Sequence, residues 1–364
     1  MRPMNAKDLD TPVVTIDLDV MERTIRRTQE YYDRHGIAFR PHIKTHKIPA
    51  IAHLQVEAGA KGITCQKVSE AEVFLASGLR DILIPYNIIG EAKLERLCHL
   101  ARQAAAGVRP GRITVCVDSA YTADGISRAA HREGVEIGVE VECDTGMRRA
   151  GVQTPQEAAD LARHIARLPG LRFAGWMTYP TTPETVPFFE EASRLIEPDG
   201  LTAAVRSGGG TPHMWQAHEA LPVVNEYRAG TYVYFDRNSV GSGAAGWDDC
   251  AMLVHMTVVS RPTPDRAILD GGSKTLSSDG VGAGQQGFGR IVEYPDAVIA
   301  GQSEEHGHVD LSACPPDRRP EIGERVTVIP NHCCVTTNLQ DEVVGVRGGE
   351  VEVIWPVLAR GKIR

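Results

Sequence analysis

The sequence lacks the long apolar segments that membrane proteins and secreted proteins carry. A membrane-spanning helix needs about 18 or more consecutive apolar residues, and none of the 364 residues belongs to such a run. The N-terminal stretch MRPMNAKDLDTP also lacks the apolar centre of a signal peptide. We therefore predict a cytoplasmic protein without membrane partners.

The sequence also lacks an excess of positive charge, a dense set of cysteines and an early dinucleotide-binding glycine motif. The net charge of −8 argues against nucleic acid as a partner. The 8 cysteines are sparse, and Cys65, Cys98, Cys116 and Cys143 lie in apolar segments, where we predict free, buried thiols. No GxGxxG motif follows an early strand-like segment, which argues against the alternative of a doubly wound dinucleotide-binding sheet.

The sequence does contain a regular alternation of strand-like and helix-like segments up to about residue 245. Eight strand-like runs are separated by amphipathic helical patterns: 37–44, 62–65, 81–85, 113–118, 136–144, 172–179, 203–207 and 226–232. Alternating strands and helices favour a parallel sheet, and eight such units fit a (β/α)8 TIM barrel. We predict an α/β chain with this barrel over residues 19–245.

The pattern changes after residue 245. Short β-rich runs at 252–259, 267–269, 325–329, 342–346 and 351–355 are separated by Gly, Pro and Asp turns, with few helical patterns. Residues 246–364 therefore predict a second domain built mainly from β-strands.

A cationic cluster ends the first strand-like run, in the segment IAFRPHIKTHK (37–47). If the strand continues to Lys44, alternation places Arg40, His42 and Lys44 on one face. Nearby positive charge lowers the pKa of a lysine, which makes Lys44 a candidate reactive amine. The alternative is that Arg40 and Lys44 are structural ion-pair partners of inward-facing acids on the fifth strand: Glu140, Glu142 and Asp144.

Glycine-rich turns follow the seventh and eighth predicted strands, at 207–211 (SGGGT) and 230–232 (GTY). Barrels commonly bind phosphate there, because such turns expose successive backbone N–H groups. A reactive lysine and a phosphate site in one barrel favour pyridoxal phosphate (PLP), whose aldehyde bonds covalently to a lysine.

A second cluster, Asn331-His332-Cys333-Cys334, suggests a metal. His332 and Cys334 are two residues apart on a strand-like segment, so both side chains would leave one face. Imidazole and thiolate suit zinc, and two protein ligands leave room for water and substrate. Cys333 would point the other way as a packed thiol.

The motifs PHIKTHK, CQKVSEAE, DTGMRRAG, SGGGTP, SEEHG and PNHCC occur in order along nearly the whole chain. Together they resemble the D-threonine aldolase and D-serine dehydratase family of fold type III PLP enzymes, which are related in architecture to alanine racemase. The resemblance implies that residues 1–18 join the β domain, which carries the metal ligands. It also implies a homodimer with active sites at its interface.

The same resemblance implies roles for individual residues. Lys44 would hold PLP and Lys47 would not, while Arg149 would lie near the cofactor's phenolic oxygen and Gln66 would face the cofactor. The full set of expected cofactor contacts is Lys44, His42, Gln66, Arg149, Tyr179, Ser207, Gly209, Gly210, Thr211 and Tyr232. His332 and Cys334 would bind a divalent metal, zinc first, with manganese or magnesium as alternatives.

The activity expected from the resemblance is a PLP- and metal-dependent lyase acting on D-3-hydroxy amino acids. We expect the D-threonine aldolase type, which yields glycine and an aldehyde. The alternative is a D-serine or D-3-hydroxy amino acid dehydratase (ammonia-lyase), which yields a 2-oxo acid and ammonia. A racemase would leave the metal pair without a function, and a PLP carrier would not need the β domain.

One position departs from the family pattern. After the sixth strand the family places a histidine suited to handling the hydroxyl proton, whereas this chain has Tyr179-Pro180. Tyr179, His213 or a metal-bound water would have to substitute as the base. Trp176, Met177 and Trp215 are further candidates for shaping the substrate pocket, or for packing.

Overall fold

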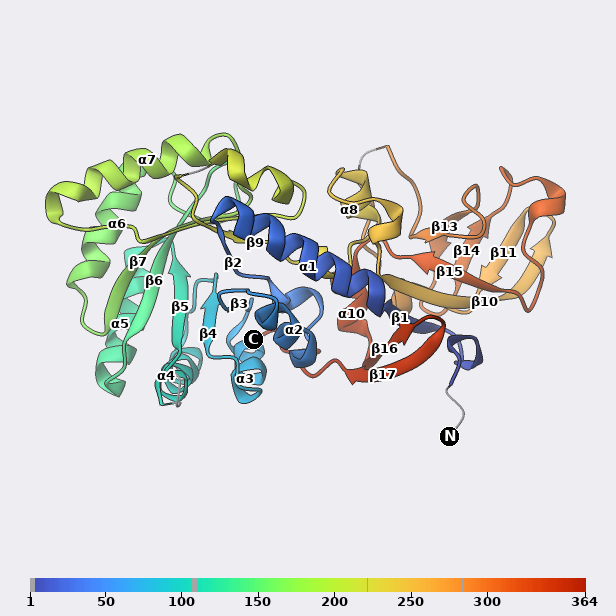
Figure 1. The fold of residues 1–364 in the computed structure, drawn as a ribbon, viewed down its shortest axis with the longest axis horizontal. Helices are drawn as coiled ribbons and strands as arrows, with labels where there is room; N and C mark the ends of the chain where they lie inside the picture. The colour runs from blue at the N-terminus through green and yellow to red at the C-terminus, as the bar shows by residue number, and fades with distance from the viewer. Residues whose placement is uncertain (1–3, 107–109, 221, 283) are drawn as a thin grey trace. The chain divides into compact units, whose positions relative to one another are not determined.

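The computed structural model describes residues 4–106, 110–220, 222–282 and 284–364 (Figure 1). The chain forms two compact units. The unit that we call the barrel unit comprises Thr28–Lys44, Ile51–Gly230 and Lys362–Arg364, and the β unit comprises Met1–Arg27, Thr45–Ala50 and Thr231–Gly361. The sequence-based boundaries at residues 18 and 245 remain a prediction about domains. Within the described ranges, no helix is both long and apolar enough to span a membrane.

The barrel unit contains an eight-stranded parallel sheet, which confirms the predicted fold. Its strands follow the order β2-β9-β8-β7-β6-β5-β4-β3. Their bounds are β2 Ala38–Phe39, β3 Ile63–Thr64, β4 Asp81–Ile84, β5 Arg112–Val117, β6 Ile137–Cys143, β7 Leu171–Thr178, β8 Val205–Gly209 and β9 Glu226–Arg228. The edges meet at a single parallel bridge between His42 and Thr64, where the Thr64 N–H donates to Pro41 O at 2.8 Å.

Helices follow the strands and lie outside the curved sheet (Figure 1). They are α1 Leu18–His35, α2 Pro49–Glu57, α3 Val68–Ala76, α4 Glu91–Ala105, α5 Ala120–Glu133, α6 Pro155–Arg167, α7 Thr185–Ile196 and the 3-10 helix η4 Met214–Ala220. Helix α6 begins as its Thr-Pro sequence predicts, because Thr154 caps it and Glu157 completes a capping box. The N-cap residue of α3 is Lys67, which makes no side-chain cap, and the Ser69 hydroxyl in its first turn donates to Arg364 O.

Strand β7 contains a β-bulge, which changes the direction of the end of the strand. The register between β6 and β7 shifts after Val139, so that Glu140 lies opposite Gly175. Gly175 has φ +150, and a Cβ there would lie 1.7 Å from the Val205 carbonyl oxygen of β8. Only glycine fits this close approach of two strands. Trp176, just after the bulge, is fully buried and donates to Ser193 of α7, so it packs the helical layer rather than a substrate pocket.

The β unit is built on a nine-stranded sheet in the order β11-β14-β13-β12-β15-β10-β1-β16-β17. The bounds are β1 Val13–Asp17, β10 Met252–Thr263, β11 Arg266–Leu269, β12 Arg290–Ile291, β13 Val298–Gln302, β14 Gly307–Asp310, β15 Arg325–Ile329, β16 Glu342–Arg347 and β17 Glu350–Pro356. A further β10–β11 pairing closes six of these strands into a ring. Strand β1 pairs with both β10 and β16.

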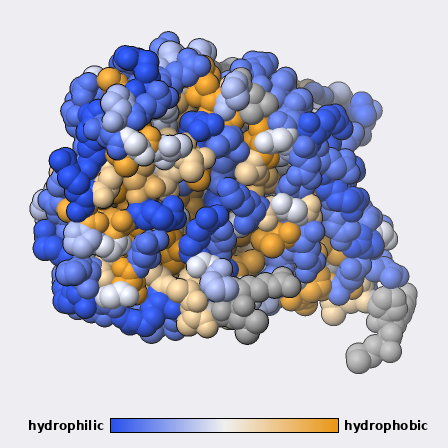
Figure 2. All heavy atoms as spheres, turned by 60° about the vertical axis from the view of Figure 1, so that its left-hand side comes forward, coloured by the Kyte–Doolittle hydropathy of each residue, from blue (hydrophilic) through white to orange (hydrophobic). Residues whose placement is uncertain are grey.

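All eight cysteines are free, and the four predicted to be buried thiols are buried. The face of the molecule seen in Figure 2 carries apolar patches between hydrophilic side chains.

Candidate active site

Lys44 does not lie on a strand, which corrects the sequence prediction. Strand β2 ends at Phe39, and residues Ile43–Thr45 form the 3-10 helix η2. Strand-type hydrogen bonds extend as far as His42, whose N–H donates to Ala229 O at 2.9 Å, and the alternation beyond it does not describe a strand. Lys44 is half-buried just past the C-terminal end of β2. Functional groups of TIM barrels gather at this end of the strands.

His42 connects Lys44 to Gln66. The Lys44 backbone N–H donates to His42 Nδ1 at 3.4 Å, and His42 Nε2 lies 2.9 Å from Gln66 Oε1. An amide oxygen only accepts, so this arrangement suits a neutral imidazole with its proton on Nε2. The Gln66 N–H in turn donates to Glu70 Oε2 at 2.6 Å. Hydrogen bonds therefore link three predicted site residues: Lys44, His42 and Gln66.

Arg40 is a structural ion-pair partner, but not of the acids that were expected. Its Nε lies 3.0 Å from Glu226 Oε2, and its Nη1 lies 2.7 Å from Asp81 Oδ1. Burial disfavours the charge of Arg40, but Glu226 and Asp81 outweigh burial and raise its pKa above the usual value. The predicted pairing of Arg40 with Glu140, Glu142 or Asp144 is wrong. The Arg40 side chain is therefore held by ion pairs in the barrel interior.

Glu140 is a second buried group of the barrel interior. Its Oε2 has no hydrogen-bond partner among the described residues. Burial, followed by repulsion from Glu226, raises the pKa of Glu140 to about 8. Burial also raises the pKa of Glu142, whose Oε1 lies 3.8 Å from Arg149 Nη2. Glu140 is therefore a buried carboxyl group that resists ionisation near neutral pH.

The glycine-rich turn after β8 is held firmly by its neighbours. The Gly209 N–H donates to Thr181 Oγ1 at 2.8 Å, and the Gly210 N–H donates to Arg228 O at 2.9 Å. Ser207 is fully buried, and its hydroxyl accepts from Arg228 and donates to Glu226. These groups already have protein partners, so their predicted contact with phosphate stays a prediction. Thr211, the next residue of the turn, is also buried.

Gly210 brings this turn next to Tyr179. It has φ +120, which favours glycine, and a Cβ built there would lie 3.8 Å from Tyr179 Cε2. Tyr179 itself is 38% exposed, and the guanidinium of Arg149 lies 5.2 Å from the centre of its ring. His213 is exposed on the same turn. The three side chains therefore follow β6, β7 and β8 at the C-terminal end of the barrel.

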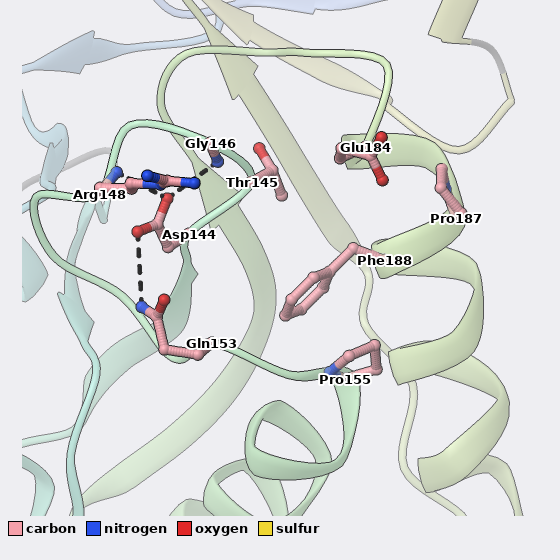
Figure 3. A pocket seen from close by; sticks show the side chains of 9 residues that line it. All are labelled: Asp144, Thr145, Gly146, Arg148, Gln153, Pro155, Glu184, Pro187 and Phe188. Atoms are coloured by element: carbon pink, nitrogen blue, oxygen red, sulfur yellow. Dashed lines mark hydrogen bonds between the residues drawn. The ribbon is translucent and has the colours of Figure 1, made fainter.

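A hollow of about 460 Å³ lies beside the loop that carries Arg149 (Figure 3). Asp144 organises this loop by accepting the N–H groups of Gly146 at 2.9 Å and Arg148 at 3.0 Å. Although burial opposes ionisation, these N–H groups hold the pKa of Asp144 below its usual value. The opposite wall comes from the start of α7, including Glu184 and Phe188. Asp144 thus shapes a loop instead of pairing with Arg40.

His332 and Cys334 lie at the start of a helix, not on a strand. His332 is the N-cap of α10 (Cys333–Leu339), and Cys334 is in its first turn. The two side chains nevertheless meet. A hydrogen bond with Cys334 outweighs burial and raises the pKa of His332 to about 9. Hydrogen bonds from Cys333 and His332 hold the pKa of Cys334 well below its usual value. Cys333 is fully buried, as predicted, but contacts Cys334 rather than pointing away.

Residues that the sequence prediction missed surround this pair. Asp279 Oδ2 lies 2.6 Å from His332 Nδ1, and Thr45 Oγ1 lies 3.2 Å from Cys334 Sγ. Asp236 accepts the Cys333 N–H at 3.1 Å. Tyr232, the last predicted phosphate contact, is buried in the 3-10 helix η5 (Thr231–Val233) of this unit. Trp215, a pocket candidate of the barrel unit, packs edge-on against Tyr31 of α1.

Two family sequence profiles match the chain. The one described as alanine racemase, N-terminal domain, matches residues 16–238, and the one described as putative serine dehydratase domain matches residues 251–346. The boundary between the two matches falls near residue 245, where the sequence changes from alternating strand and helix patterns to short β-rich runs.

Three curated relatives match nearly the whole chain. D-threonine aldolase of Arthrobacter sp is 37% identical over 97% of this chain and 93% of the relative. 3-Hydroxy-D-aspartate aldolase of Paracoccus denitrificans (strain Pd 1222) is 32% identical over 99% and 94%. D-threo-3-hydroxyaspartate dehydratase of Delftia sp. (strain HT23) is 33% identical over 90% and 92%. The relatives therefore include both aldolases and a dehydratase.

Similar solved structures also include an aldolase and a dehydratase. D-threonine aldolase from Filomicrobium marinum superposes with a TM-score of 0.86 at 33% identity, covering 100% of this chain and 99% of that one. A cysteine-to-alanine mutant of D-threo-3-hydroxyaspartate dehydratase, in the metal-free form, gives 0.84 at 30% identity, covering 97% and 99%. Sequence and structure together show that the chain belongs to the alanine-racemase-like family of D-threonine aldolase and D-serine dehydratase.

Proposed function

We propose that the chain is a PLP- and divalent-metal-dependent lyase that cleaves D-3-hydroxy amino acids as a D-threonine aldolase does. The observation that carries this proposal is Lys44, which stands at the C-terminal end of the first barrel strand within the motif PHIKTHK. Its relatives are lyases of D-3-hydroxy amino acids by name. A racemase remains the weaker alternative, because it would leave His332 and Cys334 without a role.

The residues present fit PLP. The Lys44 amine has no ion pair or hydrogen bond with any described residue, so it is available to a carbonyl group. His42 and Gln66 hold the backbone around it. Arg149 and Tyr179 are exposed at the same end of the strands, as contacts to a bound cofactor require. The turn at 207–211 and Tyr232 would supply the phosphate contacts in this proposal.

The residues also fit a divalent metal with two protein ligands. Imidazole and thiolate are a donor set typical of zinc. Within the described ranges, no three His, Cys, Asp or Glu side chains converge on one point, so water and substrate would complete the coordination. In the related dehydratase, the mutated residues are a histidine and a cysteine two positions apart, the spacing of His332 and Cys334, and the cysteine mutant is described as metal-free.

When bound, PLP withdraws electrons from the substrate's Cα, and a metal polarises the 3-hydroxyl group. The chain's own residues then decide which bond breaks. If Tyr179 Oη or His213 takes the proton of the 3-hydroxyl, the Cα–Cβ bond breaks and glycine and an aldehyde result. If the Lys44 amine takes the Cα proton instead, the hydroxyl leaves and a 2-oxo acid and ammonia result. Higher identity to an aldolase than to the dehydratase supports the first outcome.

The experiment that tests this is incubation of the PLP-loaded protein with D-threonine, D-serine and D-3-hydroxyaspartate. Glycine, aldehyde, 2-oxo acid and ammonia are assayed separately. Glycine and aldehyde in equal amounts support the aldolase, whereas 2-oxo acid and ammonia point to the dehydratase. Racemisation without any of these products would overturn the proposal. Chelator treatment should remove the lyase activity and leave the visible absorbance of PLP in place.

We also propose a cytoplasmic homodimer. Eight free cysteines, most of them buried, are typical of a reducing compartment. Large apolar side chains are exposed on loops that follow the barrel strands, with Tyr86 at 43%, Ile89 at 48% and Met147 at 45%. Exposed apolar side chains of this kind often mark protein interfaces. Light scattering of the purified protein tests this, and a monomer would contradict it.

A further inference from the structure

Asp279 contacts His332 from a loop 53 positions away in the chain. The 2.6 Å distance between Asp279 Oδ2 and His332 Nδ1 is that of a short, charge-assisted hydrogen bond. This bond occupies one of the two ring nitrogens. The second, Nε2, is therefore the nitrogen left for Cys334 and for a metal.

The loop that carries Asp279 is fastened to the residue before His332. The buried Asn331 donates through Nδ2 to Asp279 O at 3.0 Å and to Gly287 O at 2.8 Å. Its Oδ1 accepts from Arg237 Nη1 at 3.3 Å. All the hydrogen-bonding groups of this amide side chain are used. The hydrogen bond from Asn331 to the backbone carbonyl of Asp279 therefore fixes the position of Asp279 relative to His332.

Cys334 has a separate partner of its own. Thr45 is buried, and its Oγ1 lies 3.2 Å from Cys334 Sγ. A hydroxyl that donates to the sulfur would favour the thiolate, the form that binds metals. Each of the two predicted ligands is thus oriented by one side chain from a distant segment.

We propose that Asp279 is the positioning residue of the metal centre: it holds the proton of His332 on Nδ1 and so presents the Nε2 lone pair to the metal. This rests on the proposed metal-dependent function and deepens it by assigning a role to a residue outside the ligand pair. Histidine ligands of metals commonly donate their other N–H to a carboxylate, which fixes the tautomer and raises the basicity of the ring. A surface ion pair without an orienting role would leave the zinc affinity unchanged.

The test compares the zinc affinity of the wild type with that of Asp279→Asn and Asp279→Ala, by competition with a chromogenic chelator. Loss of an orienting partner typically weakens metal binding about 10- to 100-fold, with Asp279→Asn affected less because it keeps an acceptor oxygen. Asp317→Asn is the matched control, because Asp317 is an exposed acid of the same unit. Equal affinity of all four proteins would overturn the proposal. Thermal melts without metal verify folding, and Asp279→Asn decides alone if Asp279→Ala does not fold.

Two further measurements distinguish a failure of this proposal from a failure of the proposed function. Cobalt loading should give thiolate-to-metal absorbance in the wild type, and its absence there would sink the metal centre altogether. In the zinc-loaded protein, the ¹H–¹⁵N spectrum should show a protonated Nδ1 on His332 that exchanges faster with solvent in Asp279→Ala. An unprotonated Nδ1 in the wild type would overturn the role of Asp279 while leaving the metal centre intact.

Discussion

His42 Nε2 lies 2.9 Å from Gln66 Oε1, so the ring that accepts the Lys44 backbone N–H is itself held from the far side. The two residues come from segments that close the barrel, since His42 also forms the bridge to Thr64. Closure of the barrel and placement of the proposed cofactor lysine therefore depend on the same short stretch of chain.

Replacing Gln66 with leucine should weaken the enzyme without unfolding it. A net hydrogen bond is worth about 1 kcal/mol, and we expect a comparable rise in the barrier, or roughly fivefold lower kcat. The PLP spectrum and kcat with D-threonine measure the effect. Gln156→Leu, on the exposed surface of α6, is the control and should change neither. A Gln66→Leu enzyme with wild-type kinetics would show that His42 needs no such support.

Lys44→Ala should abolish the visible absorbance of covalently bound PLP and all lyase activity, because no other amine takes its place. The contrasting variant is Lys47→Met, since the buried Lys47 donates to Ala359 O at 3.3 Å and is a structural residue. We expect Lys47→Met to lower the melting temperature but to keep the absorbance. An unchanged spectrum in Lys44→Ala would contradict the central assignment.

Glu140→Gln should make the protein less sensitive to alkaline pH. The pKa of Glu140 is about 8 in the folded state against 4.5 for a glutamate in water. Its ionisation therefore does not affect stability below about pH 4.5, and increasingly destabilises the fold as the pH rises from 4.5 towards 8. Since each pKa unit corresponds to about 1.4 kcal/mol, the variant should gain a few kcal/mol relative to the wild type across this window. Melting temperatures at pH 5 and pH 8 check the difference, which should be larger at pH 8.

Arg40→Met should destabilise the barrel strongly, because among the described residues it leaves the buried carboxylate of Glu226 with one ion-pair partner, Lys61 at 3.9 Å. Removing one partner of a buried ion pair typically costs about 3–5 kcal/mol. The control is Arg194→Met, whose pair with Glu191 lies on the exposed face of α7 and should contribute little to stability. Calorimetry measures the melting temperatures of both variants. An equal decrease in the two would refute the structural role of Arg40.

Most of the barrel was predictable because each of its strands is a short apolar run between helical patterns. The segment 37–44 shows where this reasoning fails: strand-type hydrogen bonding continues to the N–H of His42, but residues Ile43–Thr45 then form a 3-10 helix. Strands β12, β13 and β14 escaped prediction because they are short and contain glycine or polar residues.

Candidate residues could be named from the sequence where chemistry is concentrated in a local motif, as at Lys44 and at the His332–Cys334 pair, and their roles stay predictions. A spacing of two suits one face of a strand, but here it joins an N-cap residue to the first turn of a helix, so the predicted element is wrong. Asp279 could not be found this way. Nothing in the sequence near it indicates that a loop brings it to His332.

The place of β1 in the middle of the β sheet has a consequence for biosynthesis. Residues 13–17 pair with residues 252–255 on one side and 344–346 on the other. The eight barrel strands end at Arg228, so they are all made before either neighbour of β1 leaves the ribosome. Contacts this distant in sequence form slowly. We expect a nascent chain released after β10 but before residue 344 to hold a formed barrel and a β1 that lacks its β16 partner, which leaves an exposed strand edge that invites aggregation.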